Sequence, residues 1–333
     1  MRQRLLVRIL CAALQCCLLM CLAALSDARM VQAQTYPAKP IRLVVPFGPG
    51  GPTDVAARIV AQILPPALGQ SVVIENRPGA GGATGSKSVA AADPDGYTLL
   101  IGTSATLAVV PALVRNPGYD PIRSFVPVAK LADSTTVLVA TPSFPPNTVA
   151  ELVAYAKAHP AAVSYASAGP GNQTHLAAEL LRASAGIELV HVPYKSGAEM
   201  VTAVLGQQVQ IAFPDISILL PLIHDRKVKA LAVTSGERHP QLPEVPTMRE
   251  SGFADHVTTF WTGVIAPTGT PPAIVDKLNA TIRDGLRTAQ IRDALAKVGA
   301  QASPGTAHAF AEFIAAETQK WLAIAKLAGM TAN

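Results

Sequence analysis

The chain of 333 residues has few cysteines, few aromatic residues and few charged residues. Its four cysteines, Cys11, Cys16, Cys17 and Cys21, all lie near the N-terminus, so the remaining chain has no thiol for a disulfide, a metal ion or a nucleophile. No His, Asp or Glu completes a metal-ligand spacing around His175, and no G-x-S-x-G nucleophile elbow occurs. The residues therefore predict no metal, no cofactor and no catalytic group.

The first 33 residues have the pattern of a secretory signal peptide. Three arginines in the first eight residues precede an apolar stretch at 9–25, and the small-residue motif Val31–Ala33 follows. Cleavage after Ala33 and a periplasmic location are therefore expected. A retained membrane anchor is the alternative, which Gln15 disfavours by interrupting the apolar stretch. Lipid attachment at Cys21 is disfavoured because the preceding residue, Met20, is bulky.

Little charge and no long apolar run remain after residue 33. Residues 1–33 contain four arginines and one aspartate, so their removal lowers the net charge from +5 to +2. Lysines and arginines form no cluster interleaved with aromatic residues, and no later apolar run reaches the roughly 20 residues that a transmembrane helix needs. We expect no nucleic-acid partner. About 300 residues exceed what one hydrophobic core usually supports, which predicts two domains.

Short apolar strands alternate with amphipathic helical segments along most of the chain. This alternation predicts βαβ units, mostly parallel sheets and an α/β fold. Helices are expected at 149–159, 174–185, 198–205 and 216–225, and again near the C-terminus at 272–287, 289–298 and 306–327. Strands are expected at 97–102, 136–141, 163–167, 188–192, 209–213 and 229–234.

No flexible linker separates the two expected domains. The candidate crossings, near 132–142 and near 256–267, are instead β-rich and apolar. Two hinge strands of this kind predict that the middle of the chain is a domain inserted into the first. The expected division is residues 34–136 with 262–333 as domain 1 and residues 137–261 as domain 2. The C-terminal helical segment is expected to pack back onto domain 1.

The segment Ile41–Leu64 predicts a strand, a Pro/Gly loop and an amphipathic helix. Glycines 48, 50 and 51 permit positive φ and close approach of a ligand to the backbone, and Thr53 or Asp54 is expected to cap the helix. The helix N–H groups and the positive end of its dipole then face the loop, which favours an anion.

Two further glycine-rich loops, at 76–88 and 166–176, also lead into helices, and Asn172 or Thr174 is the expected cap of the second helix. Such loops collect at the carboxyl ends of parallel strands, so together they predict an anion site built from backbone N–H groups and hydroxyls. Three unrelated turns are the alternative. The loop at 76–88 fits neither a phosphate loop nor a dinucleotide fingerprint, because Ser86 separates Gly85 from Lys87 and no acidic residue follows the next strand.

Three single residues have both a structural and a functional interpretation. His175 suits packing or capping better than catalysis or metal binding. Asp215 follows an apolar strand and opens a helical segment, so it is expected to cap that helix, with a ligand contact as the alternative. Phe47 lies inside the first glycine loop and is therefore expected in the pocket wall.

Several motifs in order resemble the Bug family, the solute-binding proteins of tripartite tricarboxylate transporters. They are V-P-F-G-P-G-G-P-T-D (45–54), E-N-R-P-G-A-G-G (75–82), P-D-G-Y-T-L-L (94–100), H-V-P-Y-K (191–195), A-L-A-V-T-S (230–235) and A-P-T-G-T-P (266–271). The resemblance implies a monomeric periplasmic Venus-flytrap protein, type II-like, with two domains and two hinge crossings. Asn172, Ser196 and the stretch 109–111 depart from the family pattern, which leaves the ligand open.

The resemblance also implies a function and a site. The implied function is non-enzymatic: a small carboxylate, such as a dicarboxylate, an acidic amino acid or an aromatic carboxylate, is captured and delivered to integral membrane permease subunits. A sensor-type binding protein is the alternative, and a hydrolase or isomerase using His175 and Asp215 is a further one. The implied ligand-binding residues are Phe47, Gly50, Gly51, Thr53, Asp54, Thr103, Ser104, Ala105, Gly169, Gly171, Asn172, His175 and Asp215.

Overall fold

The computed structural model describes residues 36–170, 172–327 and 329–330. The chain divides into two compact units, Met1–Ala38 and Lys39–Asn333, and every named helix and strand belongs to the second unit. The predicted signal peptide and the four cysteines lie outside the described residues, as does Gly171. Within the described ranges, no helix combines the length and hydropathy needed to cross a bilayer.

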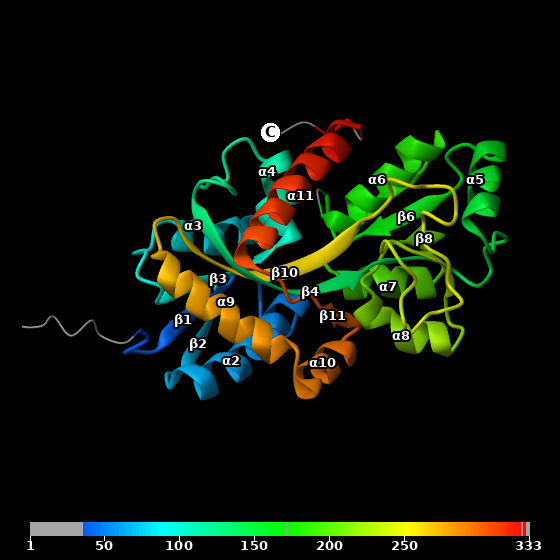
Figure 1. Cartoon of the computed structure of the whole chain (residues 1–333). Helices are drawn as coiled ribbons and strands as arrows, with labels where there is room; N and C mark the ends of the chain where they lie inside the picture. The colour runs from blue at the N-terminus through cyan, green and yellow to red at the C-terminus, as the bar shows by residue number, and fades with distance from the viewer. Residues whose placement is uncertain (1–35, 171, 328, 331–333) are drawn as a thin grey trace, which may run out of the picture. The chain divides into compact units, whose positions relative to one another are not determined.

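The first part of the second unit is built on a six-stranded sheet with the order β11-β4-β10-β3-β1-β2. Its strands are β1 (Ile41–Val45), β2 (Val72–Asn76), β3 (Thr98–Thr103), β4 (Phe125–Thr135), β10 (Thr259–Pro267) and β11 (Ala300–Ala302). Its helices are α2 (Pro52–Leu68), η1 (Ala80–Gly82), α3 (Ala83–Ala90), η2 (Ala105–Val109), α4 (Val110–Leu113), α9 (Pro272–Leu286), α10 (Ala289–Ala296) and α11 (Ala307–Leu327). We call this part the six-stranded lobe (Figure 1).

The second part, the five-stranded lobe, is built on a sheet with the order β7-β6-β8-β5-β9. Its strands are β5 (Val137–Ala140), β6 (Ser164–Ser167), β7 (Val190–Pro193), β8 (Ile211–Ala212) and β9 (Lys229–Val233). Its helices are α5 (Val149–Ala158), α6 (Gln173–Ala185), α7 (Gly197–Leu205) and α8 (Ile216–His224). Each sheet has buried apolar side chains on both faces, which explains why the sequence shows short continuous apolar runs.

The predicted α/β class and the predicted strands and helices are confirmed, but the expectation of mostly parallel sheets is wrong. The parallel ladders are β1–β2, β1–β3, β6–β7 and β6–β8. The ladders of β10 with β3 and β4, of β11 with β4, and of β5 with β8 and β9 are antiparallel. The reason is that β4 leaves the six-stranded sheet and β10 returns beside it, so these two strands run in opposite directions.

The chain passes between the lobes twice, as expected. It leaves the six-stranded lobe between β4 and β5 and returns between β9 and β10, and hydroxyl groups tie these segments together. Thr136 Oγ1 and Thr234 Oγ1 lie 2.8 Å apart, and Thr234 Oγ1 also donates to the carbonyl oxygen of Thr258 at 2.8 Å. The boundaries at 136/137 and 261/262 stay a prediction.

The C-terminal helix α11 packs back onto the six-stranded lobe, as predicted. The ring of Phe310 meets Trp261 of β10 edge-on, with ring centroids 5.7 Å apart. Both tryptophans of the chain donate their indole N–H to Glu317, Trp261 at 3.0 Å and Trp321 at 3.1 Å. The end of α11 also reaches the five-stranded lobe, because Trp321 belongs to the same buried cluster as Leu176 of α6. Helix α11 therefore contacts both lobes.

Candidate functional site

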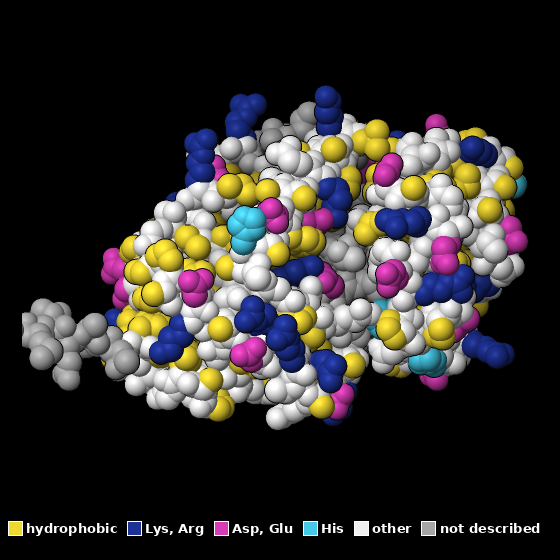
Figure 2. All heavy atoms as spheres, viewed as in Figure 1, with side chains coloured by type: hydrophobic (Ala, Val, Ile, Leu, Met, Phe, Trp, Pro, Cys, Tyr) yellow, Lys and Arg dark blue, Asp and Glu magenta, His cyan; other side chains and the backbone are white. Residues whose placement is uncertain are grey.

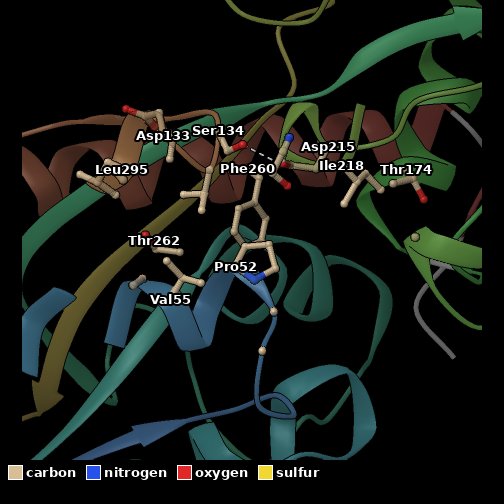
Figure 3. Close-up of a pocket in the computed structure, with 18 of the residues that line it drawn as sticks. Pro52, Val55, Asp133, Ser134, Thr174, Asp215, Ile218, Phe260, Thr262 and Leu295 are labelled. Carbon is tan, nitrogen blue, oxygen red and sulfur yellow. Dashed lines mark hydrogen bonds between the residues drawn. The ribbon is translucent and has the colours of Figure 1, made fainter. Parts of the chain in front are cut away.

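A cavity of about 390 Å³ lies where the two lobes meet (Figure 3). The six-stranded lobe contributes the start of α2, parts of β4, β10 and β11, and α10 with the turn that follows it. The five-stranded lobe contributes the starts of α6, α7 and α8. The lining residues are Gly50, Gly51, Pro52, Val55, Ala56, Ala132, Asp133, Ser134, Thr174, Gly197, Ala198, Met200, Asp215, Ser217, Ile218, Phe260, Thr262, Leu295, Val298 and Ala300.

Four helix N-termini open toward this cavity. Gly51 is the N-cap of α2, Thr174 lies in the first turn of α6, Gly197 begins α7, and Asp215 caps α8. Backbone N–H groups in the first turn of a helix have no partner within the helix, and the helix dipole places partial positive charge there. The cavity therefore has the electrostatics of an anion site, although none of the described residues that line it is a lysine or an arginine.

Helix α2 begins without a side-chain cap, which corrects the expectation that Thr53 or Asp54 would cap it. Asp54 is almost fully buried and instead accepts hydrogen bonds from Gly50 N–H at 3.1 Å, Asn76 Nδ2 at 3.1 Å and Arg58 Nε at 2.8 Å. Burial raises the pKa of this carboxyl, but the hydrogen bonds outweigh burial and lower the pKa overall. Asp54 thus holds the loop in shape rather than lining the cavity.

Asp215 lines the cavity and caps α8, so both interpretations from the sequence fit its position. Its carboxylate accepts hydrogen bonds from Ser217 N–H at 2.9 Å and from Ser134 Oγ at 2.6 Å, and Ser134 belongs to β4 of the other lobe. Burial raises the pKa of Asp215, against the lowering effect of these hydrogen bonds. The Ser134 contact, marked by the dashed line in Figure 3, joins the two lobes directly.

A second cavity, of about 730 Å³, uses the same two loops as the first. Phe47 from the loop before α2 and Asn172 from the start of α6 line it, together with Ala105 of η2. Gln173 also lines it and accepts a hydrogen bond from Ser104 Oγ at 2.9 Å, which again links the lobes. The predicted residues are therefore divided between two cavities that share the loops at 47–52 and 172–174.

Other predicted site residues line neither cavity. Thr53, Thr103 and Ser104 are buried, and Thr103 Oγ1 accepts a hydrogen bond from Thr106 N–H at 3.2 Å, which fixes the turn after β3. Gly169 has φ of +117° and forms hydrogen bonds with Ser167 Oγ. Their positions support the walls of the cavities.

His175 packs inside the five-stranded lobe, as the structural interpretation of the sequence expected. Its ring stacks on His191 with centroids 3.9 Å apart, and His191 Nε2 lies 2.6 Å from Ser167 Oγ. Burial lowers the pKa of His175 to about 4, and the neighbouring His191 adds to this effect. His175 is therefore neutral at pH 7. By stacking on His191, which contacts Ser167, His175 helps to hold the loop at 167–174 in place.

Residues outside the predicted set also line the first cavity, notably Ser134, Gly197 and Phe260. Ser134 and Phe260 are directly paired on β4 and β10, so the crossing strands themselves form one wall. Phe260 carried a weak sequence signal, because aromatic residues are scarce in this chain. Gly197 had no sequence signal of its own; it simply follows Ser196, the N-cap of α7.

Known proteins are similar to this chain in sequence and in fold. The model of a family described as "Tripartite tricarboxylate transporter family receptor" matches residues 56–330. The chain is similar to protein BugT of Bordetella pertussis, with 38% identity over 309 residues, or 92% of this chain and 95% of BugT.

Two solved structures from Rhodopseudomonas palustris are similar in fold and hold carboxylates. Rpa4515 with adipate has a TM-score of 0.80 and 35% identity, covering 90% of this chain and all of that protein. MatC with bound malate has a TM-score of 0.75 and 34% identity, covering 87% of this chain and 99% of that protein.

Proposed function

We propose that this chain, which belongs to the family of tripartite tricarboxylate transporter receptors, captures a small carboxylated solute between its two lobes. The solute is then delivered to the integral membrane permease subunits of such a transporter. The resemblance of six sequence motifs to the Bug family and the carboxylates in Rpa4515 and MatC support this proposal.

One observation carries the proposal: four helix N-termini meet at a cavity that has no basic side chain among the lining residues that the structure describes. Among them, α7 begins with Gly197 and Ala198, which both line the cavity. The hydroxyl of its N-cap Ser196 accepts from Glu199 N–H, so the N–H groups at 197 and 198 suit an external acceptor. A ligand carboxylate at this point would satisfy those donors and interact with the helix dipoles.

Release to a permease requires that the two lobes separate. Few direct polar contacts bridge them at the site, among them Ser134 with Asp215 and Ser104 with Gln173. A ligand that touches both lobes favours the closed arrangement by its difference in affinity for the two states. The signal peptide at residues 1–33 and the periplasmic location are part of the same proposal, because a receptor of this family works outside the cytoplasm.

A thermal-unfolding screen of the purified protein against mono- and dicarboxylates tests the proposal. A ligand at 100 times its Kd stabilises the folded state by about 2.7 kcal/mol, which raises Tm by a few degrees. Isothermal titration then gives the stoichiometry, expected to be one ligand per chain. Uncharged analogues of the same size, such as the primary amides, serve as controls. Equal shifts with acid and amide, or none with any carboxylate, would contradict the proposal.

A further inference from the structure

The first cavity has two ends of different chemistry. In the view of Figure 3, Thr174 and Ile218 lie at one end, Val55 and Leu295 lie at the other, and the Phe260 ring stands between them above Pro52. The end at Thr174 is where the starts of α6, α7 and α8 meet, and the N–H groups of Gly197 and Ala198 in the first turn of α7 are the donors there. We call the opposite end, formed by Val55 and Leu295 with Asp133 and Thr262 beside them, the apolar end.

The apolar end offers little to a second negative charge. Its aliphatic side chains are those of Val55 and Leu295, and Thr262 Oγ1 is the hydroxyl among the residues that form it. The charged group at this end is the carboxylate of Asp133, which forms an ion pair with Lys130 at 2.7 Å. Lys130 itself is not among the residues that line the cavity. A carboxylate buried against aliphatic groups without donors loses its hydration and gains no compensating partner.

The charge of the whole lining leads to the same conclusion. Within the described part of the chain, Asp133 and Asp215 are the charged side chains that line the cavity, and no basic residue lines it. Helix N-termini carry roughly half a positive charge each, so four of them supply about +2. Asp215 offsets about one of these charges and Lys130 pairs with Asp133, which leaves about one positive charge for a ligand. A dianion would add a second negative charge to a low-dielectric space that already has two carboxylates in its wall.

From the two ends of the cavity and the charge of its lining, we infer that this protein selects a singly charged carboxylate with an apolar aliphatic or aromatic body, and discriminates against dicarboxylates of the same skeleton. The carboxylate lies at the helix N-termini, the body passes along Phe260, and its far end contacts Val55 and Leu295. This inference rests on the proposed function and refines its ligand class. It sets this chain apart from Rpa4515 and MatC, whose structures hold adipate and malate.

Matched ligand pairs test the inference by titration calorimetry on the purified protein. Hexanoate against adipate, and benzoate against terephthalate, differ by one carboxylate each. The monocarboxylate of at least one pair is expected to bind tenfold or more tightly than its partner. Equal or tighter binding of both dicarboxylates would overturn the inference while leaving the proposed function intact. Absence of binding by all four acids, and by shorter mono- and dicarboxylates, would overturn both.

Two variants locate the source of the discrimination. Val55→Lys places an ammonium group at the apolar end and is expected to shift the adipate-to-hexanoate affinity ratio at least tenfold toward adipate. Val73→Lys, at an exposed position on β2 outside both cavities, is the matched control and should leave the ratio unchanged. Asp133→Asn, which keeps the shape of the side chain, should move the ratio in the same direction if Val55→Lys does not fold. An unchanged ratio in the folded variants would contradict the placement of the ligand.

Discussion

At the scale of single residues, most polar groups near the site are used to hold loops in place. Asp54 fixes the loop before α2, and Ser104 joins Gln173 across the lobes. The buried side chain of His256 does not hold a loop by hydrogen bonds in this way. His256 is almost fully buried, stacks on Phe213 with ring centroids 5.5 Å apart, and has no hydrogen-bond partner on either ring nitrogen.

His256 should make the fold sensitive to acid. Burial lowers the pKa of His256 to about 3, against an ordinary value of 6.5. Between these two values the unfolded chain binds a proton that the folded chain does not, so stability falls as pH drops from 6.5 toward 3. The slope for one such group is at most about 1.4 kcal/mol per pH unit.

The variant His256→Gln should therefore show a flatter decline than the unchanged protein. Urea unfolding at pH 7, 6, 5 and 4 gives the free energies of unfolding, and the difference between the two proteins should shrink toward acid pH. His308→Gln, at an exposed position of α11, is the control. Parallel pH profiles for the His256 variant and the unchanged protein would contradict the prediction.

At the scale of elements, two contacts fix how the C-terminal segments approach the rest. The turn between α10 and β11 lies against the start of α8 through Gly299, which has φ of +67°. A Cβ at this position would lie 2.7 Å from Ile216 Cγ2 and 3.3 Å from the backbone nitrogen of Ser217. Only glycine allows this close approach without displacing the helix start that lines the cavity.

Gly299→Ala is expected to push the turn away from α8 and to weaken ligand binding about tenfold or more. Strain at positive φ adds a loss of stability of about 1 kcal/mol. Gly305→Ala is a suitable control, because its Cβ would meet nothing within 4 Å and its φ is not positive. Titration calorimetry with the best carboxylate measures the effect. Unchanged affinity in a folded Gly299→Ala protein would show that this contact does not shape the site.

Glu317 of α11 is the second contact: it joins this helix to β10 through Trp261. Its buried carboxylate accepts from both indole N–H groups and forms an ion pair with Lys320. Glu317→Gln keeps the size of the side chain but removes the charge, so we expect a loss of about 1–3 kcal/mol in the free energy of unfolding and a shift in tryptophan emission. Glu312→Gln, exposed on the same helix, should change neither quantity. Equal effects of the two substitutions would contradict a special role for Glu317.

At the scale of the whole molecule, two lobes joined by two crossings suit opening and closing about those crossings. At the site, Ser134 with Asp215 and Ser104 with Gln173 are direct polar contacts between the lobes. One buried apolar cluster, which includes Leu176 and Trp321, spans both lobes, whereas the other large buried clusters each lie within one lobe. On the face shown in Figure 2, acidic and basic side chains are interspersed over both lobes.

Ligand binding should therefore make the molecule more compact. Small-angle X-ray scattering is expected to give a smaller radius of gyration with a saturating carboxylate than without it. The primary amide of the same ligand, which should not bind, is the control. Identical scattering with and without a bound carboxylate, with binding verified by calorimetry, would show that capture occurs without closure.

The sequence alone predicted much of this protein, because its signals are local. Apolar runs between glycine-rich loops identify strands and helix starts, and Asn172 and Asp215 were expected caps that the structure confirms. The family resemblance extended these local signals to a two-lobed fold. The pairing direction of β10 and β11, the lack of a cap on α2 and the division of the site into two cavities were not predictable in this way.

Those features depend on contacts between residues far apart in the chain. Phe260 faces Ser134 because β10 returns beside β4, and Gly299 meets Ile216 because α10 and β11 follow that return. Leu295 and Val55 are ordinary helix residues in the sequence and become one end of a cavity only after both lobes are assembled. Local sequence thus determined where the glycine-rich loops and helix starts lie, while the tertiary structure decided what surrounds the cavity between them, because side chains from distant segments set its charge and polarity.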